Sequence, residues 1–370
     1  MDIHQLDCFR GDTYANKKNP KPFHSRCEQK HVSYQHDQLI ERIHYLKKLN
    51  GSSFKRLYQQ AQEDKGIKSY RLVAPKQIQE IKRLNELAPN ISEVTDYIAQ
   101  SLCLPLYTNN RIMGFRPILL LGDPGIGKSY ITKLIARFLG IDFKSIDMGS
   151  LTSAFELQGN NSSWNSSQPG QLARAAIESP IGNFMLLLDE IDKAPTRTQY
   201  PPLNALYPLL EEHTAKYYRD AYLEMAFDLS KLMIIATANT VDTIHPALLS
   251  RFYIINIKKP TAQQQMKIVK AIFHQLIKDK HIHEIQNKAL STEIIHHLSK
   301  SSPREIKRKL EIALSKSAYE RASRFNPEQR FDNVADLEEL VLEPHHFGIK
   351  ESAGNKPATK VVPLFNRSLF

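Results

Sequence analysis

The 370-residue sequence has no run of about 18 consecutive apolar residues, the length that a membrane-spanning helix requires. Its first residues, MDIHQLDCFRGD, contain no apolar stretch of the kind found in a signal peptide. Only three cysteines are present, without a CxxC spacing, which argues against a disulfide scaffold and a standard zinc finger. These absences predict a cytoplasmic protein with no membrane partner.

The composition, with 41% hydrophobic and 24% charged residues, is that of a globular protein with two or three domains. The formal net charge is +11, and residues 258–325 alone carry +9. A basic segment of this kind is a candidate for contact with nucleic acid or an acidic partner. Solvated helix faces give the same composition, so nucleic acid is the less favoured partner.

The middle of the chain has the pattern of an α/β domain. Helical periodicity is expected over 74–87, and a further helix, with Asn90 near its cap, is expected to end at Pro105. Apolar runs of strand length then alternate with helical segments, which is typical of a parallel sheet with helices on both faces. These runs are residues 117–122, 143–148, 184–189, 231–238 and 253–257. We therefore predict an α/β nucleotide-binding domain over 76–257, with its core at 106–257.

The flanking parts differ in character from this domain. Residues 1–75 are basic and polar, with helical spacing only between His36 and Gln62, and predict a flexible, partly helical N-terminal extension. After Pro260 the strands stop, and three amphipathic helices predict a small all-helical lid domain over 258–325. Residues 326–370 are expected to form a C-terminal tail.

The pattern GxxxxGK[ST] stands at residues 122–129 as GDPGIGKS, after an apolar run and before a helical pattern. This strand–loop–helix context is the one that a phosphate-binding loop requires. The glycines let backbone N–H groups face the phosphates, the lysine reaches the β- and γ-phosphates, and the serine offers a hydroxyl to Mg²⁺. The predicted nucleotide-binding residues are Gly122, Asp123, Pro124, Gly125, Ile126, Gly127, Lys128, Ser129 and Tyr130.

A second apolar run, FMLLL, ends in two adjacent carboxylates, Asp189 and Glu190. Successive side chains at a strand end point in different directions, so Asp189 is placed to hold Mg²⁺ while Glu190 orients or deprotonates a water. A phosphotransferase has no use for an activated water, so the pair favours hydrolysis. The alternative, an exposed acidic helix start, is weakened by the apolar residues before the pair.

Three further polar residues are candidates for the same site. Asn239 follows the run IIATA and is expected at the edge of the sheet where ligands of open α/β folds bind. Arg251 precedes the last strand, and Arg304 opens a helix of the basic domain. A guanidinium delivered to the γ-phosphate stabilises transition-state charge. An ordinary turn asparagine and ordinary surface arginines are the alternatives.

Five segments, in this order and at these separations, resemble the conserved elements of AAA+ ATPases. They are GDPGIGKS (Walker A), LLLDEIDKA (Walker B), IIATAN (sensor 1), PALLSRF (arginine finger) and SPREIKRKLE (sensor 2). The stretches 155–172 and 218–252 are similar to the AAA+ module of Lon proteases. The resemblance covers about 115–320 and, more faintly, the helix at 89–105.

The resemblance implies roles for individual residues and for the whole chain. Lys128 and Ser129 bind phosphate and Mg²⁺, Asp189 the metal, and Glu190 the water. Asn239 is sensor 1, Arg251 is a finger acting on a neighbouring subunit, and Arg304 is sensor 2. Trp164 stands where the family has an aromatic residue in its central pore, although a core tryptophan is the alternative. The expected protein is an ATP-hydrolysing homo-oligomeric ring, a hexamer, that remodels or unfolds a polypeptide substrate.

The sequence also departs from Lon proteases. The residues after the lid are too few for a serine-lysine protease domain, so no peptidase of its own is expected. Most of the segment that contributes to the adenine pocket in Lon is missing before residue 117. Two other functions stay open: a DNA-associated AAA+ loader or switch that uses the basic lid, and an adaptor that docks on a separate protease through PLFNRSLF.

Overall fold

The computed structural model describes residues 28–50, 55–164, 167–282, 289–322 and 340–349. Within these ranges, no helix combines the length and the apolar composition that a bilayer crossing requires.

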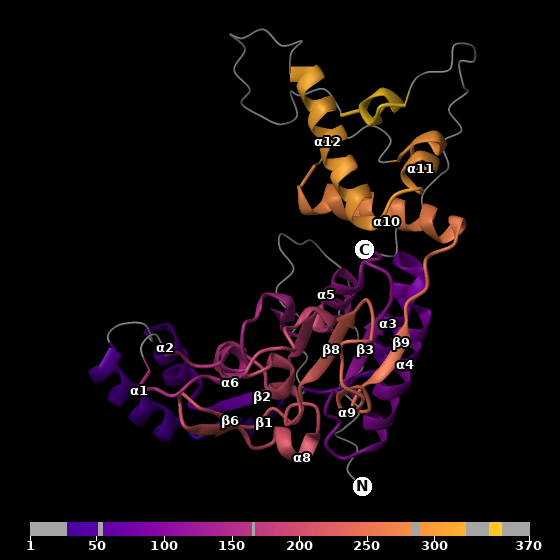
Figure 1. Ribbon diagram of the computed structural model, residues 1–370. Coiled ribbons are helices and arrows are strands. Elements are labelled where there is room, and N and C mark those ends of the chain that lie inside the picture. The colour runs from indigo at the N-terminus through magenta and orange to yellow at the C-terminus, as the bar shows by residue number, and fades with distance from the viewer. Residues whose placement is uncertain (1–27, 51–54, 165–166, 283–288, 323–339, 350–370) are drawn as a thin grey trace, which may run out of the picture.

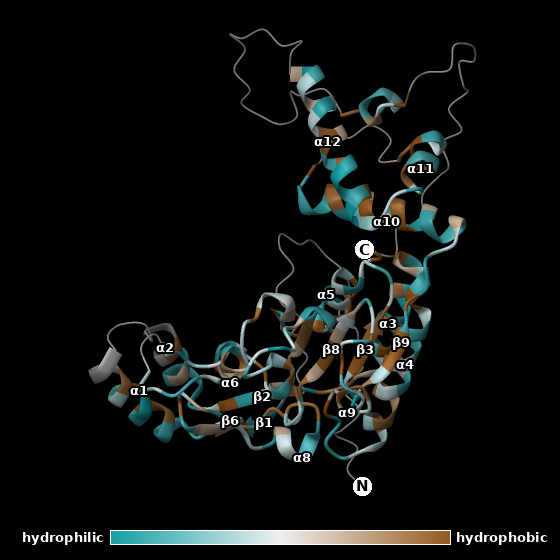
Figure 2. Ribbon diagram, in the orientation of Figure 1, coloured by the Kyte–Doolittle hydropathy of each residue, from teal (hydrophilic) through white to brown (hydrophobic). Residues whose placement is uncertain are grey.

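A five-stranded parallel sheet forms the centre of the fold, as the apolar runs predict (Figure 1). Its strands, in chain order, are β3 (Ile118–Leu121), β4 (Phe143–Asp147), β5 (Met185–Asp189), β8 (Met233–Ala238) and β9 (Tyr253–Asn256). Their order across the sheet is β4-β5-β8-β3-β9. Leu121 of β3 pairs with Ala238 of β8 and with Asn256 of β9, so the carboxyl ends of these strands lie level. Figure 2 shows the apolar residues gathered along the central strands.

Helices cover this sheet and connect its strands. The helix α5 packs on β5 and β8, and α3 packs between α4 and α5. The longer ones are α3 (Pro75–Leu87), α4 (Ser92–Cys103), α5 (Lys128–Leu139) and α7 (Gln171–Glu178). The single-turn helices are η3 (Pro89–Ile91), η4 (Leu104–Tyr107), η5 (Met148–Ser150), α6 (Phe155–Gln158), η6 (Ile191–Lys193), η7 (Pro202–Leu206), α8 (Glu212–Ala215) and α9 (Pro246–Leu249).

The structure corrects the expected cap of α4. The N-cap position is Ile91, without a side-chain hydrogen bond, because residues 89–91 form the turn η3. The Asn90 amide instead donates to the carbonyl of Lys258 at 3.4 Å. Asn90 therefore links the start of α4 to the connection that leads into the lid.

The N-terminal region differs from the flexible extension expected over 1–75. Residues 28–71, which we call the N-terminal unit, contain β1 (Glu28–Val32), α1 (His36–Asn50), α2 (Lys55–Asp64) and β2 (Ile67–Arg71). The strands β1 and β2 pair antiparallel, and Leu39, Ile43 and Leu46 on α1 are fully buried in the same core as the central sheet. The helical spacing between His36 and Gln62 predicts the two helices, whereas the strands β1 and β2 are not expected from the sequence. The expected residues 1–27 of the extension lie outside the described ranges.

A short antiparallel hairpin, β6 (Tyr218–Asp220) and β7 (Met225–Phe227), joins the N-terminal unit to the sheet domain. Tyr34 forms a β-bridge with Phe227, and the Asp228 N–H donates to the Ser33 carbonyl at 2.8 Å. Sequence periodicity missed the hairpin because its strands have only three residues each.

The lid is built as predicted from three helices: α10 (Ala262–Asp279), α11 (Thr292–Leu298) and α12 (Pro303–Ala322). Thr261 and Gln264 form a capping box at the start of α10, and Ser291 caps α11. These helices enclose a second apolar core. Leu340, Leu342 and Phe347 pack on it beside the turn η10 (Pro344–Phe347), so this part of the expected tail belongs to the lid.

Lys68 on β2 is the polar anchor of the N-terminal unit. Its side chain is only 1% exposed, and its ammonium group pairs with Asp64 and donates to the carbonyls of Ile177 and Ser179 at 2.7 Å each. Burial lowers the pKa of Lys68, while the Asp64 carboxylate opposes that shift. Lys68 thus joins the N-terminal unit to the carboxyl end of α7, where its ammonium group donates to two backbone carbonyls.

We predict that Lys68→Met lowers the free energy of unfolding by about 3–5 kcal/mol, because it leaves the Asp64 carboxylate without its buried counter-charge. Urea unfolding followed by circular dichroism measures the change. The matched control is Lys30→Met at an exposed position of β1, with an expected change below about 0.5 kcal/mol. Equal stabilities of the two variants would contradict the anchoring role.

Candidate functional site

The loop between β3 and α5 has a backbone that only glycine adopts without strain. Gly125 and Gly127 have φ angles of 77° and 96°, in the left-handed region. At Gly122, an added Cβ would lie 2.7 Å from the Ile257 carbonyl oxygen, so the loop passes close to the end of β9. The helix α5 begins directly after the loop, and a helix N-terminus of this kind attracts anions.

Lys128 lies buried behind this loop. Its ammonium group donates to the carbonyls of Gly122 at 2.6 Å and Asp123 at 3.0 Å, and to Asn239 Oδ1 at 2.9 Å. Burial lowers the pKa of Lys128, and Asp192, Asp189 and Glu190 oppose that shift. The loop carbonyls therefore hold the Lys128 ammonium group at the edge of the sheet, close to three acidic residues.

Asp189, at the end of β5, accepts two hydroxyl hydrogen bonds on one oxygen. Ser129 Oγ donates to its Oδ1 at 2.7 Å, and Thr237 Oγ1 donates to the same atom at 2.5 Å. A carboxylate next to a serine hydroxyl supplies the oxygen ligands that Mg²⁺ prefers. Ser129 and Asp189 therefore fit a Mg²⁺ site beside the phosphate-binding loop.

Glu190 follows Asp189 and has an unusual backbone conformation. Its φ angle is 54°, in the left-handed region, and its N–H donates to Thr237 Oγ1 at 2.9 Å. Its carboxylate lies near Gly149, after β4, since a Cβ on Gly149 would be 3.9 Å from Glu190 Oε2. Thr237 thus fixes both acidic residues of the pair. Sequence analysis does not assign Thr237, although a hydroxyl residue two positions before Asn239 is a signal in the sequence.

Asp192 is a second residue that the sequence interpretation missed. Its side chain is buried, and its Oδ2 accepts the Asn239 N–H at 3.1 Å. Its backbone carbonyl accepts a hydrogen bond from Thr243 Oγ1 at 2.9 Å. Asp192 therefore holds the backbone of Asn239, whose side-chain oxygen accepts from Lys128. The sequence DEID contains this third carboxylate, but its spacing does not reveal that it binds the Asn239 backbone.

The two candidate arginines take different places. Arg251 pairs with Glu211 at 2.7 Å, donates to the Ala247 carbonyl at 2.6 Å and lies over the Tyr207 ring, 4.9 Å from its centroid. These contacts are outside the phosphate-binding loop. Arg304 is exposed at the start of α12. Its neighbour Ser302 lies beside the loop, because a Cβ on Gly125 would be 3.7 Å from Ser302 Cβ.

Two further residues of the predicted loop, Asp123 and Tyr130, lie on its outer side, whereas Ile126 packs against the core. Asp123 pairs with Lys259 at 2.8 Å, which lowers the pKa of the Asp123 carboxyl. Tyr130 is 46% exposed. The structure brings residues 122–130, Asp189, Glu190 and Asn239 to one edge of the sheet, with Ser302 of the lid beside the loop and Arg251 apart.

Trp164 lies away from these residues, in a turn that follows α6. It is 49% exposed and packs edge-on against Phe155, whose ring also contacts Tyr200. The alternative of a core tryptophan is therefore wrong.

A separate group of possible metal ligands, Glu320, His345 and His346, lies in the lid. His346 Nδ1 accepts the Glu343 N–H at 3.0 Å, so in the neutral ring the proton is on Nε2, which donates to Glu320. A protonated Nε2 does not bind a metal ion. These residues form a hydrogen-bonded cluster that fastens η10 to α12.

A comparison with protein families finds a match within the sheet domain. Residues 118–259 match the family described as "ATPase family associated with various cellular activities (AAA)". The Lon protease of Wolbachia pipientis subsp. Culex pipiens is 32% identical over 279 residues, which are 73% of this chain and 33% of the relative. The Lon protease of Mycoplasma pneumoniae is 33% identical over 192 residues, or 52% of this chain and 24% of the relative. The chain thus spans about a third or less of these relatives.

Solved structures share the fold at low sequence identity. Hsp104 with ATPγS and FITC casein in a closed state aligns with a TM-score of 0.52 and 18% identity, over 75% of this chain and 51% of that chain. The extended Hsp104:casein complex of S. cerevisiae aligns with a TM-score of 0.53 and 17% identity, over 75% of this chain and 50% of that chain.

We predict that Thr237→Val destabilises the protein by about 1–3 kcal/mol, because the Glu190 N–H loses its acceptor and Asp189 loses a donor. Thr237→Ser keeps the hydroxyl and is expected to stay closer to the original stability. Urea unfolding of both variants gives the difference. A valine variant as stable as the serine variant would show that the hydroxyl does not hold the acidic pair.

Proposed function

We propose that this chain is an ATP-driven protein remodelling factor. The premise is that residues 118–259 match the AAA ATPase family, which implies ATP hydrolysis, and that the chain is similar to Lon proteases. In this proposal it assembles as a homo-oligomeric ring, a hexamer, and acts on polypeptides. The observation that supports it best is the convergence of Lys128, Asp189 and Asn239 at one edge of the sheet.

Each residue of this edge has a role in the proposed reaction. The N–H groups of the loop and Lys128 bind the β- and γ-phosphates of ATP. Ser129 and Asp189 would hold Mg²⁺, which neutralises phosphate charge when bound. Glu190 orients or deprotonates the attacking water, and Asn239 positions that water while its backbone stays fixed by Asp192.

The two arginines complete the proposed site from outside the loop. Ser302, two residues before Arg304, lies beside the loop. In this proposal, Arg304 contacts the nucleotide from the lid of the same chain. Arg251 acts in trans on the γ-phosphate held by a neighbouring subunit. Its contacts with Glu211 and Tyr207 hold the guanidinium on the surface segment that would meet that neighbour.

The polypeptide partner is inferred from Trp164. A half-exposed tryptophan among asparagine and serine residues is available to grip an extended chain. The Hsp104 structures of similar fold were determined with casein, which makes casein a reasonable first probe.

We predict that Lys128→Ala loses ATP binding, because the phosphates lose their cation, whereas Glu190→Gln binds ATP and fails to hydrolyse it. A fluorescent ATP analogue measures binding, and phosphate release measures hydrolysis. Lys133→Ala on the exposed side of α5 is the matched control for both. Normal turnover by Glu190→Gln would show that another group activates the water.

We predict that Arg251→Ala retains ATP binding but loses about 10³-fold or more in hydrolysis, since a finger arginine stabilises transition-state charge. Mixing it with Lys128→Ala should restore part of the activity. The Lys128→Ala subunits supply the arginine, and the Arg251→Ala subunits supply the nucleotide site. Arg219→Ala, at an exposed position of β6, is the control.

Two results of these mixtures would contradict the trans assignment. One is full activity of Arg251→Ala alone, and the other is the absence of any recovery while mass measurements show mixed rings. Parallel assays with single-stranded DNA separate the remodelling factor from a loader, because hydrolysis stimulated by DNA and not by casein would favour the loader.

A further inference from the structure

Trp164 belongs to a segment with its own internal hydrogen bonds. We define the Trp164 segment as residues 159–164. Asn161 Oδ1 accepts from the N–H and the hydroxyl of Ser163 at 3.0 and 2.8 Å, and the Trp164 N–H donates to the Asn161 carbonyl at 3.1 Å. These bonds make the segment a compact turn. A compact turn can be moved or fixed as one piece by a contact at any of its residues.

The base of this turn is fastened to the β6–β7 hairpin by Asp220. The buried carboxylate of Asp220 accepts the N–H groups of Gly170 at 2.8 Å, Tyr222 at 3.0 Å and Leu223 at 2.8 Å. A Cβ on Gly159 would lie 2.9 Å from both oxygens of this carboxylate. The start of the Trp164 segment therefore rests against the turn of the hairpin.

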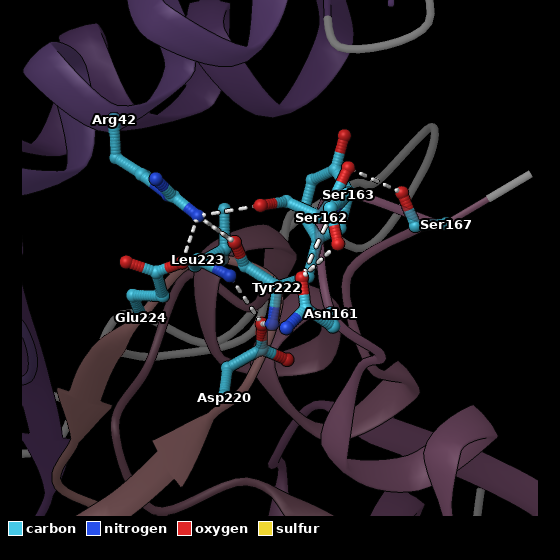
Figure 3. Close-up of polar contacts among 9 residues, drawn as sticks. All are labelled: Arg42, Asn161, Ser162, Ser163, Ser167, Asp220, Tyr222, Leu223 and Glu224. Carbon is cyan, nitrogen blue, oxygen red and sulfur yellow. Dashed lines mark hydrogen bonds and ion pairs between the residues drawn. The ribbon is translucent and has the colours of Figure 1, made fainter. Parts of the chain in front are cut away.

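Arg42 on α1 reaches the upper part of the same assembly from the N-terminal unit (Figure 3). Its Nη2 donates to Ser162 Oγ at 2.9 Å and to the Tyr222 carbonyl at 3.1 Å, and it also pairs with Glu224. Its Nε donates to the Tyr222 carbonyl at 3.3 Å. One guanidinium thus bonds to the Trp164 segment and the hairpin at once.

The position of Arg42 makes this contact well defined. Its side chain is only 16% exposed, and its guanidinium carbon lies 5.2 Å from the centroid of the Tyr45 ring, one turn further along α1. A planar guanidinium with several N–H donors is suited to hold three acceptors in a fixed geometry. The contact with Ser162 lies two residues from Trp164.

We propose that Arg42 is a positioning residue that locks the Trp164 segment to the β6–β7 hairpin, so that the N-terminal unit sets how Trp164 meets an incoming polypeptide. This inference rests on the proposed remodelling function. Its first part, the locking of the segment, concerns the fold of this chain alone and is tested separately.

Intrinsic fluorescence tests the locking directly, because Trp164 is the only tryptophan of the chain. In Arg42→Ala, we expect red-shifted emission, stronger quenching by acrylamide and lower anisotropy than in the original protein. Ser162→Ala should cause part of the same change, since it removes only the bond to the Trp164 segment. Glu41→Ala, exposed and adjacent on α1, is the matched control and should leave the emission unchanged.

The double variant Arg42→Ala/Ser162→Ala shows whether the two residues act through one contact. If they do, its emission and quenching match those of Arg42→Ala alone. Arg42→Lys keeps a positive charge for Glu224 but not the planar fork, so it should fall between the original protein and Arg42→Ala. Changes in Ser162→Ala that add fully to those of Arg42→Ala would overturn the locking.

Casein-stimulated ATP hydrolysis tests the second part. We expect Arg42→Ala to keep the basal rate of ATP hydrolysis. It should need about tenfold more casein for half-maximal stimulation, because it loses a hydrogen bond from a charged group. Trp164→Ala should abolish the stimulation. A role of Arg42 in stability alone would instead lower the unfolding midpoint and leave the half-maximal casein concentration unchanged, which would overturn the inference.

The two assays separate the possible failures. If casein does not stimulate the original protein, the proposed function fails, whereas the fluorescence of Trp164 still decides the locking. If casein stimulates and the fluorescence of Arg42→Ala equals that of the original protein, the locking fails and the proposed function stands.

Discussion

The oxygen Oδ1 of Asp189 is the atom on which the candidate site depends. It accepts hydroxyl hydrogen bonds from Ser129, at the start of α5, and from Thr237, in β8. The same Thr237 oxygen accepts the N–H of Glu190 and holds that residue in a left-handed conformation. Three segments distant in sequence are therefore fixed at one edge of the sheet. The separate roles proposed for Asp189 and Glu190 need this arrangement, because it fixes the Asp189 carboxylate and the Glu190 backbone through one hydroxyl group.

The N-terminal unit likewise fixes a second region of the chain through contacts between segments that are distant in the sequence. Lys68 ties the unit to the end of α7, and Arg42 ties it to the Trp164 segment and the hairpin. Both contacts use a buried or half-buried cation that donates to backbone carbonyls. A unit fixed in this way is a structural part of the domain, and a movement of α1 would be transmitted to Trp164.

The sequence predicts most of the fold because β3, β5 and β8 are short, almost purely apolar runs. It also points to residues 122–130, Asp189, Glu190 and Asn239, which the structure places at one edge of the sheet, because their types and spacing fit a phosphate-binding motif. The roles of Thr237 and Asp192 are not predicted, because each depends on hydrogen bonds to residues that are distant in the sequence. The N-terminal unit escapes because Lys68 and Arg42 look like solvated charges until their acceptors, which are distant in sequence, are known.

The most direct test of the account is steady-state ATP hydrolysis across a protein concentration series, with the mass of the same samples determined in ATP and with casein added in parallel. A ring with sites completed by Arg251 of a neighbour predicts that activity per subunit rises as the oligomer forms and rises again with casein. A monomer that hydrolyses ATP at the full rate at every concentration, with no response to casein, would contradict the account.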